Sequence, residues 1–152
     1  QIWMGPTHDI ISDPKEFCPT YLKDNDIALF KHPERSCLYD EANTLIELTK
    51  GPGGDYDVLD NIYRQLEFYK EEGFPKDFGL FELSASIRKN TPKIQAMNLR
   101  WWEIICRFSS RDQISLPFVL NSLNINVKVL PGFANNGLRQ NPIIPQLYYK
   151  GF

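Results

Sequence analysis

The chain has 152 residues, of which 42% are hydrophobic and 24% charged, as in an ordinary globular domain. This length buries a real core, so folding needs neither disulfides nor a structural metal. The formal net charge of −2 argues against nucleic acid as the main partner, and no apolar stretch approaches the roughly 18 residues of a membrane span.

The first third of the chain is expected to hold strands that alternate with helices. Asp13 and Pro14 form a good helix start, with Asp13 as the cap and proline in the first turn. The glycine- and proline-rich segment 51–54 ends a later helix. The hydrophobic pattern predicts a strand over 2–4, a short helix over 14–22, a strand over 27–30 and a helix over 36–50.

The rest of the chain continues the alternation. Gly73 is the expected C-cap of the next helix, and Pro75 follows at the usual distance. The pattern predicts a helix over 56–72, a strand over 80–88, helices over 94–108 and 114–123, and a strand over 125–130. This order indicates a mixed α/β domain over residues 1–130, with a sheet covered by helices. Residues 131–152 are expected to form an extended tail that wraps the surface or contacts a partner.

The most suggestive polar segment is Ser110-Arg111-Asp112-Gln113, between two predicted helices. Two interpretations stand. In the structural one, Ser110 or Asp112 caps the following helix and Arg111 forms a surface ion pair. In the functional one, Asp112 accepts hydrogen bonds from sugar hydroxyls or acts as a base, while Arg111 offsets phosphate charge.

A second polar group follows the strand predicted over 27–30. His32 and Arg35 stand at its carboxyl end, where open α/β sheets tend to bind ligands, although a simple turn explains them equally. Glu41 follows in the next helix. Trp101 and Trp102 are either core residues or platforms for sugar rings.

Other patterns favour a structural role. Asp24-Asn25-Asp26 matches the D-x-D pattern of metal-dependent glycosyltransferases, but it precedes a strand and does not follow one, which favours turn chemistry. The 51–54 segment has no Lys-Ser/Thr after it and is expected to be a linker. The three cysteines fit buried free thiols in a reducing compartment. We therefore predict no metal site in this chain and a cytoplasmic location.

A longer set of residues, taken in order, resembles a known family. The set is Ile2-Trp3, Ser12-Asp13-Pro14, Phe30-Lys31-His32-Pro33-Glu34-Arg35, Tyr39-Asp40-Glu41-Ala42, Gln65-Leu66-x-x-Tyr69, Gly73-Phe74-Pro75, Gly79-Leu80-x-Glu82, Ile87-Arg88, Trp101-Trp102-Glu103 and Ser110-Arg111-Asp112-Gln113. Over about residues 2–130 the chain is similar to the glycosyltransferase-like domain of the plant seed-mucilage and pollen-turgor proteins, which also occurs in microbes and viruses. A plant-type relative would lie in the Golgi lumen.

This resemblance implies a Rossmann-like sheet covered by helices, as in the C-terminal part of a GT-A-type nucleotide-diphosphate-sugar transferase. It implies transfer of a hexose from a nucleotide sugar to a glycan acceptor. Asp112 is then the acceptor-side carboxylate, and Arg111 either stabilises charge or fixes Asp112. His32 and Arg35 line the donor cleft, and the other substrate-binding candidates are Glu41, Trp101, Trp102 and Gln113.

Two departures keep alternatives open. In the family, the strand that ends in Ile-Trp leads into an aspartate resembling a ligand for Mn²⁺ or Mg²⁺, whereas this chain reads Met4-Gly5-Pro6-Thr7, with Asp9 as the nearest carboxylate. The family's nucleotide-binding residues are expected ahead of Gln1. A non-catalytic binding or structural protein is therefore the alternative, and a ceramidase-like amide hydrolase is a weaker one.

Overall fold

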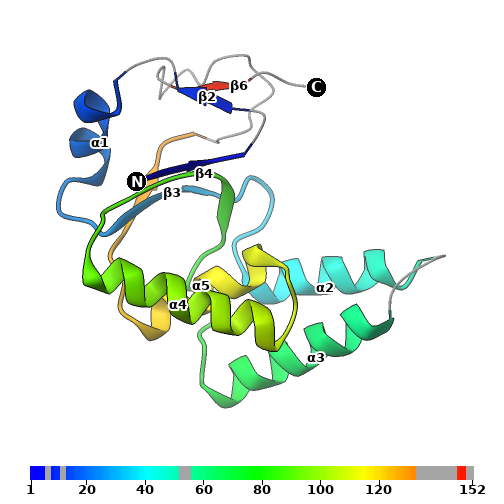
Figure 1. Ribbon diagram of the computed structural model, residues 1–152. Coiled ribbons are helices and arrows are strands. Elements are labelled where there is room, and N and C mark those ends of the chain that lie inside the picture. Colours follow the sequence, from blue (N-terminus) through cyan, green and yellow to red (C-terminus); the bar gives the residue numbers. More distant parts are fainter. Residues whose placement is uncertain (6–7, 11–12, 52–55, 133–146, 150–152) are drawn as a thin grey trace. The chain divides into compact units, whose positions relative to one another are not determined.

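The computed structural model describes residues 1–5, 8–10, 13–51, 56–132 and 147–149 (Figure 1). The chain divides into two compact units, each described below by itself. The first comprises Gln1–Pro33, Phe81–Gln95 and Ile125–Phe152, and the second comprises Glu34–Leu80 and Ala96–Asn124. The elements in chain order are β1 (Ile2–Met4), β2 (His8–Ile10), α1 (Pro14–Leu22), β3 (Ile27–Lys31), α2 (Leu38–Thr49), α3 (Tyr56–Glu71), β4 (Phe81–Arg88), α4 (Pro92–Arg107), α5 (Asp112–Ser122), β5 (Val127–Leu130) and β6 (Leu147–Tyr149).

The first unit is built on a mixed four-stranded sheet with the strand order β1-β4-β3-β5. The strand β4 pairs antiparallel with both β1 and β3, whereas β3 and β5 run parallel. The register between β3 and β4 shifts after Leu29, which lies opposite Ser86, while Phe30 lies opposite Glu82. The predicted α/β class with a Rossmann-like sheet is confirmed.

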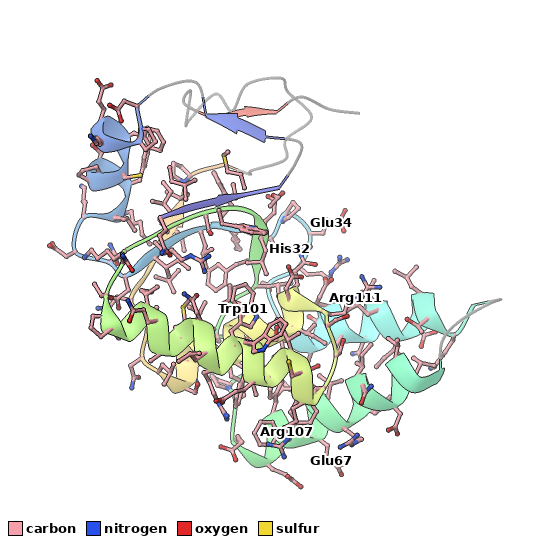
Figure 2. All side chains as sticks on the ribbon, viewed as in Figure 1. His32, Glu34, Glu67, Trp101, Arg107 and Arg111 are labelled. Carbon is pink, nitrogen blue, oxygen red and sulfur yellow. The ribbon has the colours of Figure 1, made fainter. Side chains whose placement is uncertain are left out.

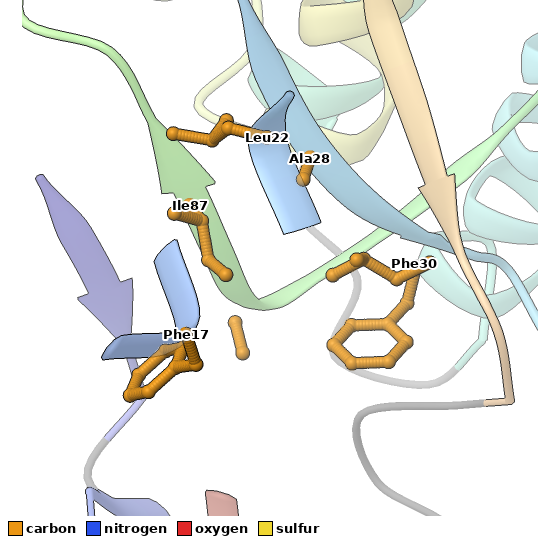
Figure 3. Close-up of a cluster of buried hydrophobic side chains, with 7 residues drawn as sticks. Phe17, Leu22, Ala28, Phe30 and Ile87 are labelled. Atoms are coloured by element: carbon orange, nitrogen blue, oxygen red, sulfur yellow. The ribbon is translucent and has the colours of Figure 1, made fainter. Parts of the chain in front are cut away.

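The helix α1 packs on this sheet and closes its core (Figure 3). Phe17 and Leu22 of α1 meet Ala28 and Phe30 of β3 and Ile87 of β4, all of them buried. Since burial of a large apolar side chain contributes about 1.5–3 kcal/mol, this cluster is a main source of the unit's stability.

Local capping chemistry sets two helix ends as the sequence predicts. The carboxylate of Asp13 accepts a hydrogen bond from the Lys15 amide at 2.9 Å, and Pro14 occupies the first helical turn of α1. At the end of α3, Gly73 has φ of +70°, a left-handed conformation that glycine adopts without a steric penalty. The Phe74 amide then donates to the Tyr69 carbonyl at 2.9 Å, which satisfies the end of the helix.

The second unit is helical, with α2 packed on α3 and α5. Its core is mostly aliphatic but includes a cluster of aromatic rings. The rings of Tyr69 on α3 and Phe118 on α5 stack with centroids 4.2 Å apart and an interplanar angle of 15°. The guanidinium of Arg107, a residue labelled in Figure 2, lies over the rings of Phe68 and Phe108, at 4.7 and 4.9 Å from their centroids. α3 and α5 are thus held together by ring packing.

Two strands near the end of the chain differ from the sequence pattern. In the strand predicted over 125–130, the sequence alternates Ile125, Val127 and Val129 with Asn126, Lys128 and Leu130, but this pattern does not match the burial in β5, because Val129 is half exposed and Leu130 is buried. Residues 147–149, within the predicted tail, form β6, which pairs antiparallel with β2. No helix in the described ranges is long and apolar enough to cross a bilayer.

Candidate functional site

Arg111, Asp112 and Gln113 lie at the start of α5, in the second unit. The predicted cap by Ser110 or Asp112 is wrong, because Arg111 is the N-cap residue and its side chain makes no capping bond. Asp112 occupies the first helical position, and its Oδ1 accepts the Gln113 amide at 2.9 Å. The carboxylate is exposed at the positive end of the helix, which stabilises its negative charge. Arg111 is also exposed and forms no ion pair within the described residues.

Buried hydrogen bonds from α3 hold the turn before α5. The Gln65 Nε2 donates to the Tyr69 hydroxyl at 2.7 Å, and Gln65 Oε1 accepts the Ser109 amide at 3.3 Å. The Ser109 hydroxyl then accepts the Arg111 amide at 3.1 Å. Gln65 and Tyr69 are completely buried, and burial raises the pKa of the Tyr69 phenol well above its ordinary value. The Tyr69 hydroxyl therefore stays protonated at every physiological pH.

A second set of bonds reaches the same turn from α4. The indole Nε1 of Trp101 donates to the buried Ser115 hydroxyl at 2.7 Å, and that hydroxyl donates to the Asp112 carbonyl at 3.0 Å. Figure 2 labels Trp101 on α4 and Arg111 ahead of α5. Trp102 projects into solvent, with 65% of its surface exposed. Trp101 therefore belongs to the framework of the Asp112 turn, whereas Trp102 offers a free ring face.

Arg35 and Glu41 are brought together at the start of α2. The Arg35 Nε donates to the Glu41 carboxylate, which is buried, and its Nη1 lies 3.1 Å from the exposed Glu34 carboxylate. Two carboxylates thus already offset the charge of Arg35. Its predicted place in a donor cleft stays a prediction.

His32 belongs to the first unit, where it follows β3 and is buried. The strand β3 runs parallel to its neighbour β5, and ligands tend to bind at the carboxyl ends of such strands. The position of His32 therefore agrees with the sequence argument. Its predicted role in donor binding also stays a prediction.

Asp26, the last residue of the D-x-D pattern, ties three parts of the first unit together. Its Oδ2 accepts the Asn126 amide at 2.9 Å and the Lys93 ammonium at 2.7 Å. Its carbonyl accepts the Lys89 amide at 2.9 Å. Burial raises the pKa of this carboxyl, but the bonds from Lys93 and Asn126 and the charges of Lys93 and Lys89 outweigh it, so the pKa is lowered overall. This geometry makes Asp26 a clamp between the starts of β3, β5 and α4.

The described residues do not fit the divalent metal that the family resemblance implies. At the end of β1, Met4 and Gly5 offer no carboxylate, and the Gly5 amide donates to the Ser84 carbonyl at 2.7 Å. Pro6, Thr7 and the 52–55 segment lie outside the described residues, as does the side chain of Asp9. Within the described ranges, no three His, Cys, Asp or Glu side chains gather as metal ligands.

All three cysteines are free thiols, as predicted. Their predicted burial is wrong for Cys106, which is exposed, whereas Cys18 and Cys37 are half-buried. Burial raises the pKa of the Cys18 thiol, which keeps it in the less reactive protonated form.

Sequence reasoning missed three residues that support the candidate site: Gln65, Ser109 and Ser115. A signal existed only for Gln65, a polar residue four positions before Tyr69 on the buried side of a helix. Such a side chain must find buried partners, but the sequence does not say which.

A comparison with protein families gives one match. The family model described as TOD1/MUCI70, glycosyltransferase-like domain, matches residues 1–141 of the sequence. The chain belongs to this family. No curated protein and no solved structure matches the chain.

Proposed function

We propose that this member of the TOD1/MUCI70 family transfers a hexose from a nucleotide sugar to a glycan or similar acceptor. The observation that carries the proposal is the Arg111-Asp112 turn. It presents an exposed carboxylate and an exposed guanidinium on consecutive residues, whose backbone is held by buried and partly buried hydrogen bonds. Catalytic groups act best when a rigid framework fixes them.

In the proposed step, an acceptor hydroxyl attacks the anomeric carbon of the donor. Asp112 accepts the hydroxyl proton as the general base, while the new C–O bond forms. The bond between the anomeric carbon and the phosphate oxygen breaks, and the nucleoside diphosphate leaves with the electron pair. Arg111 offsets the negative charge that develops on this leaving group, since a guanidinium donates two parallel hydrogen bonds to phosphate.

Trp101 and Gln113 have side chains that suit an acceptor site at this turn. Trp101 is anchored through Ser115 to the Asp112 carbonyl, so its indole has a fixed orientation. Gln113 is half-buried next to Asp112 and has an amide side chain suited to sugar hydroxyls. We propose that Trp101 and Gln113 orient the acceptor, and that the exposed Trp102 contacts a further sugar ring.

One observation favours a second candidate function, a non-catalytic protein that binds glycans on the same scaffold. Gly5 stands where the family resemblance implies a metal-binding aspartate, and its amide continues the β1 pairing with Ser84. Such a protein would keep the acceptor site and lose turnover.

The three free thiols support a cytoplasmic location, in a reducing compartment, for either function.

A turnover assay separates the two candidates. The full-length protein is incubated with a panel of nucleotide sugars and oligosaccharide acceptors, and products are identified by mass spectrometry. The proposed function predicts an acceptor heavier by one hexose, with release of an equal amount of nucleoside diphosphate. Saturable oligosaccharide binding without any product would instead establish the binding protein.

A further inference from the structure

We propose that Gln65 is a positioning residue for Arg111 and Asp112, a role that rests on the proposed function. Gln65 lies on α3, and 44 residues separate it from Ser109 in sequence. It touches neither Arg111 nor Asp112 through any of the hydrogen bonds described above. Its effect reaches them through the backbone of the turn.

The connection from α3 to the turn consists of three hydrogen bonds in series. Gln65 is fixed by the Tyr69 hydroxyl, it holds the Ser109 amide, and Ser109 holds the Arg111 amide. Each member before Arg111 is buried, so water cannot easily replace a lost partner. A buried amide with both ends bonded fixes the position of its neighbours more strictly than an apolar side chain of the same size.

Tyr69 gives this connection a second attachment to α5. Its ring stacks on Phe118, two turns into the helix, while its hydroxyl accepts from Gln65. The pair Gln65 and Tyr69 thus contacts both the turn before α5 and the body of α5. Together they set where the first turn of α5, with the Asp112 carboxylate, stands relative to α3.

Two different side chains hold the two backbone amides of the turn, and amide hydrogen exchange can measure each amide separately. The Ser109 amide depends on the Gln65 side chain, whereas the Arg111 amide depends on the Ser109 side chain. Replacing Gln65 should release the Ser109 amide directly, and it should also weaken the bond from the Arg111 amide, because Ser109 is then no longer held in place. Replacing Ser109 by alanine should release the Arg111 amide alone, since alanine keeps the backbone N–H that bonds to Gln65.

The test measures amide hydrogen exchange by NMR in the full-length protein, together with the kinetics of hexose transfer. Gln65→Leu should speed exchange at Ser109 and Arg111 about 5- to 10-fold. It should lower kcat by up to about 10²-fold with little change in the donor KM, because the misplaced groups, Asp112 and Arg111, act on the proton and the charge that move in the transition state. Ile62→Val, at a buried position of the same helix, is the control and should change neither.

The conservative variants complete the test. Ser109→Ala should speed exchange at Arg111 only and lower kcat by a smaller factor. If Gln65→Leu does not fold, Ser109→Ala still tests whether the hydrogen bonds of the turn position Arg111 and Asp112. Gln65→Glu keeps an acceptor for the Ser109 amide and should recover part of kcat.

Two results would overturn the proposal. One is unchanged exchange at Ser109 and Arg111 in Gln65→Leu. The other is faster exchange with an unaltered kcat. If the parent protein itself transfers no hexose, the proposed function fails, and so does the catalytic part of this inference, while the exchange data still decide whether Gln65 fixes the turn.

Discussion

Asp26 offers a sharp test of the structure, because two explanations of the same carboxylate predict opposite results. As a clamp, it holds the Asn126 amide and the Lys93 ammonium. As a metal ligand in a D-x-D pattern, it would act together with Asp24. The informative changes are Asp26→Ala and Asp26→Asn, with Asp24→Asn as the matched control, since Asp24 is exposed.

The expected cost follows from the contacts. Asp26 is half-buried, and loss of a hydrogen bond from a backbone amide to a charged acceptor costs about 1.5–3 kcal/mol. The ion pair adds about 0.5–1 kcal/mol, because the Lys93 side chain is 41% exposed and water weakens the pair. Asp26→Ala should therefore lower the free energy of unfolding by about 2–4 kcal/mol. Asp26→Asn keeps an oxygen acceptor for the Asn126 amide and should cost about 1 kcal/mol, and Asp24→Asn less than about 0.5 kcal/mol.

The pH dependence of this cost has a definite sign. The pKa of Asp26 is lowered in the folded protein, so the ionised form contributes stability above the unfolded pKa of aspartate, about 3.9. That contribution disappears as the pH falls through the folded pKa. The stability gap between the parent and Asp26→Asn should therefore be full near neutral pH and shrink under acid conditions below pH ~4.

Urea unfolding between pH 3 and pH 7 measures these differences directly, and calorimetric titration with Mn²⁺ tests the alternative. The clamp predicts no saturable Mn²⁺ binding that depends on Asp24 or Asp26. A tight site abolished by Asp26→Asn, or an Asp26→Ala protein as stable as the parent, would refute the reasoning.

Two further changes test the framework around the candidate site. Trp101→Phe removes the indole N–H that donates to the Ser115 hydroxyl, and it should lower the free energy of unfolding in urea by about 1 kcal/mol. Trp102→Phe, at an exposed position, should change it by less than about 0.5 kcal/mol. Equal losses in the two variants would argue against the Trp101 bond. Glu41→Gln removes a buried charge that pairs with Arg35, and it should lower the thermal midpoint by an amount that corresponds to about 3 kcal/mol. Glu34→Gln removes the exposed partner of the same guanidinium and should change the thermal midpoint little. A larger effect of Glu34→Gln than of Glu41→Gln would contradict this assignment of the ion pair.

Features that depend on neighbouring residues were predictable from the sequence. Asp13 followed by Pro14 has one physical meaning, a helix start, and the structure shows that cap. Gly73 likewise marks the end of α3, because few other residues adopt its left-handed backbone. Hydrophobic spacing placed the helices and strands of the sheet within a few residues of their observed ends.

Features that depend on residues far apart in the sequence were not predictable from it. Asp26 meets Asn126 across 100 residues, and Gln65 meets Ser109 across 44. No local pattern encodes such pairs, because they exist only once the sheet and the helices have packed. For the same reason, the sequence alone could not decide which of Trp101 and Trp102 is anchored.

The central claim is that Asp112 is the general base of a hexosyl transfer, and Asp112→Asn tests it most directly. Asparagine keeps the shape of the side chain and an oxygen that can accept the Gln113 amide, so the thermal midpoint should move by no more than corresponds to about 1 kcal/mol. With the basic carboxylate gone, transfer by the full-length protein should slow by about 10²–10⁴-fold. Asp60→Asn, the same change at an exposed position of α3, should leave transfer unaltered. An Asp112→Asn protein that melts like the parent and transfers hexose just as fast would contradict the account.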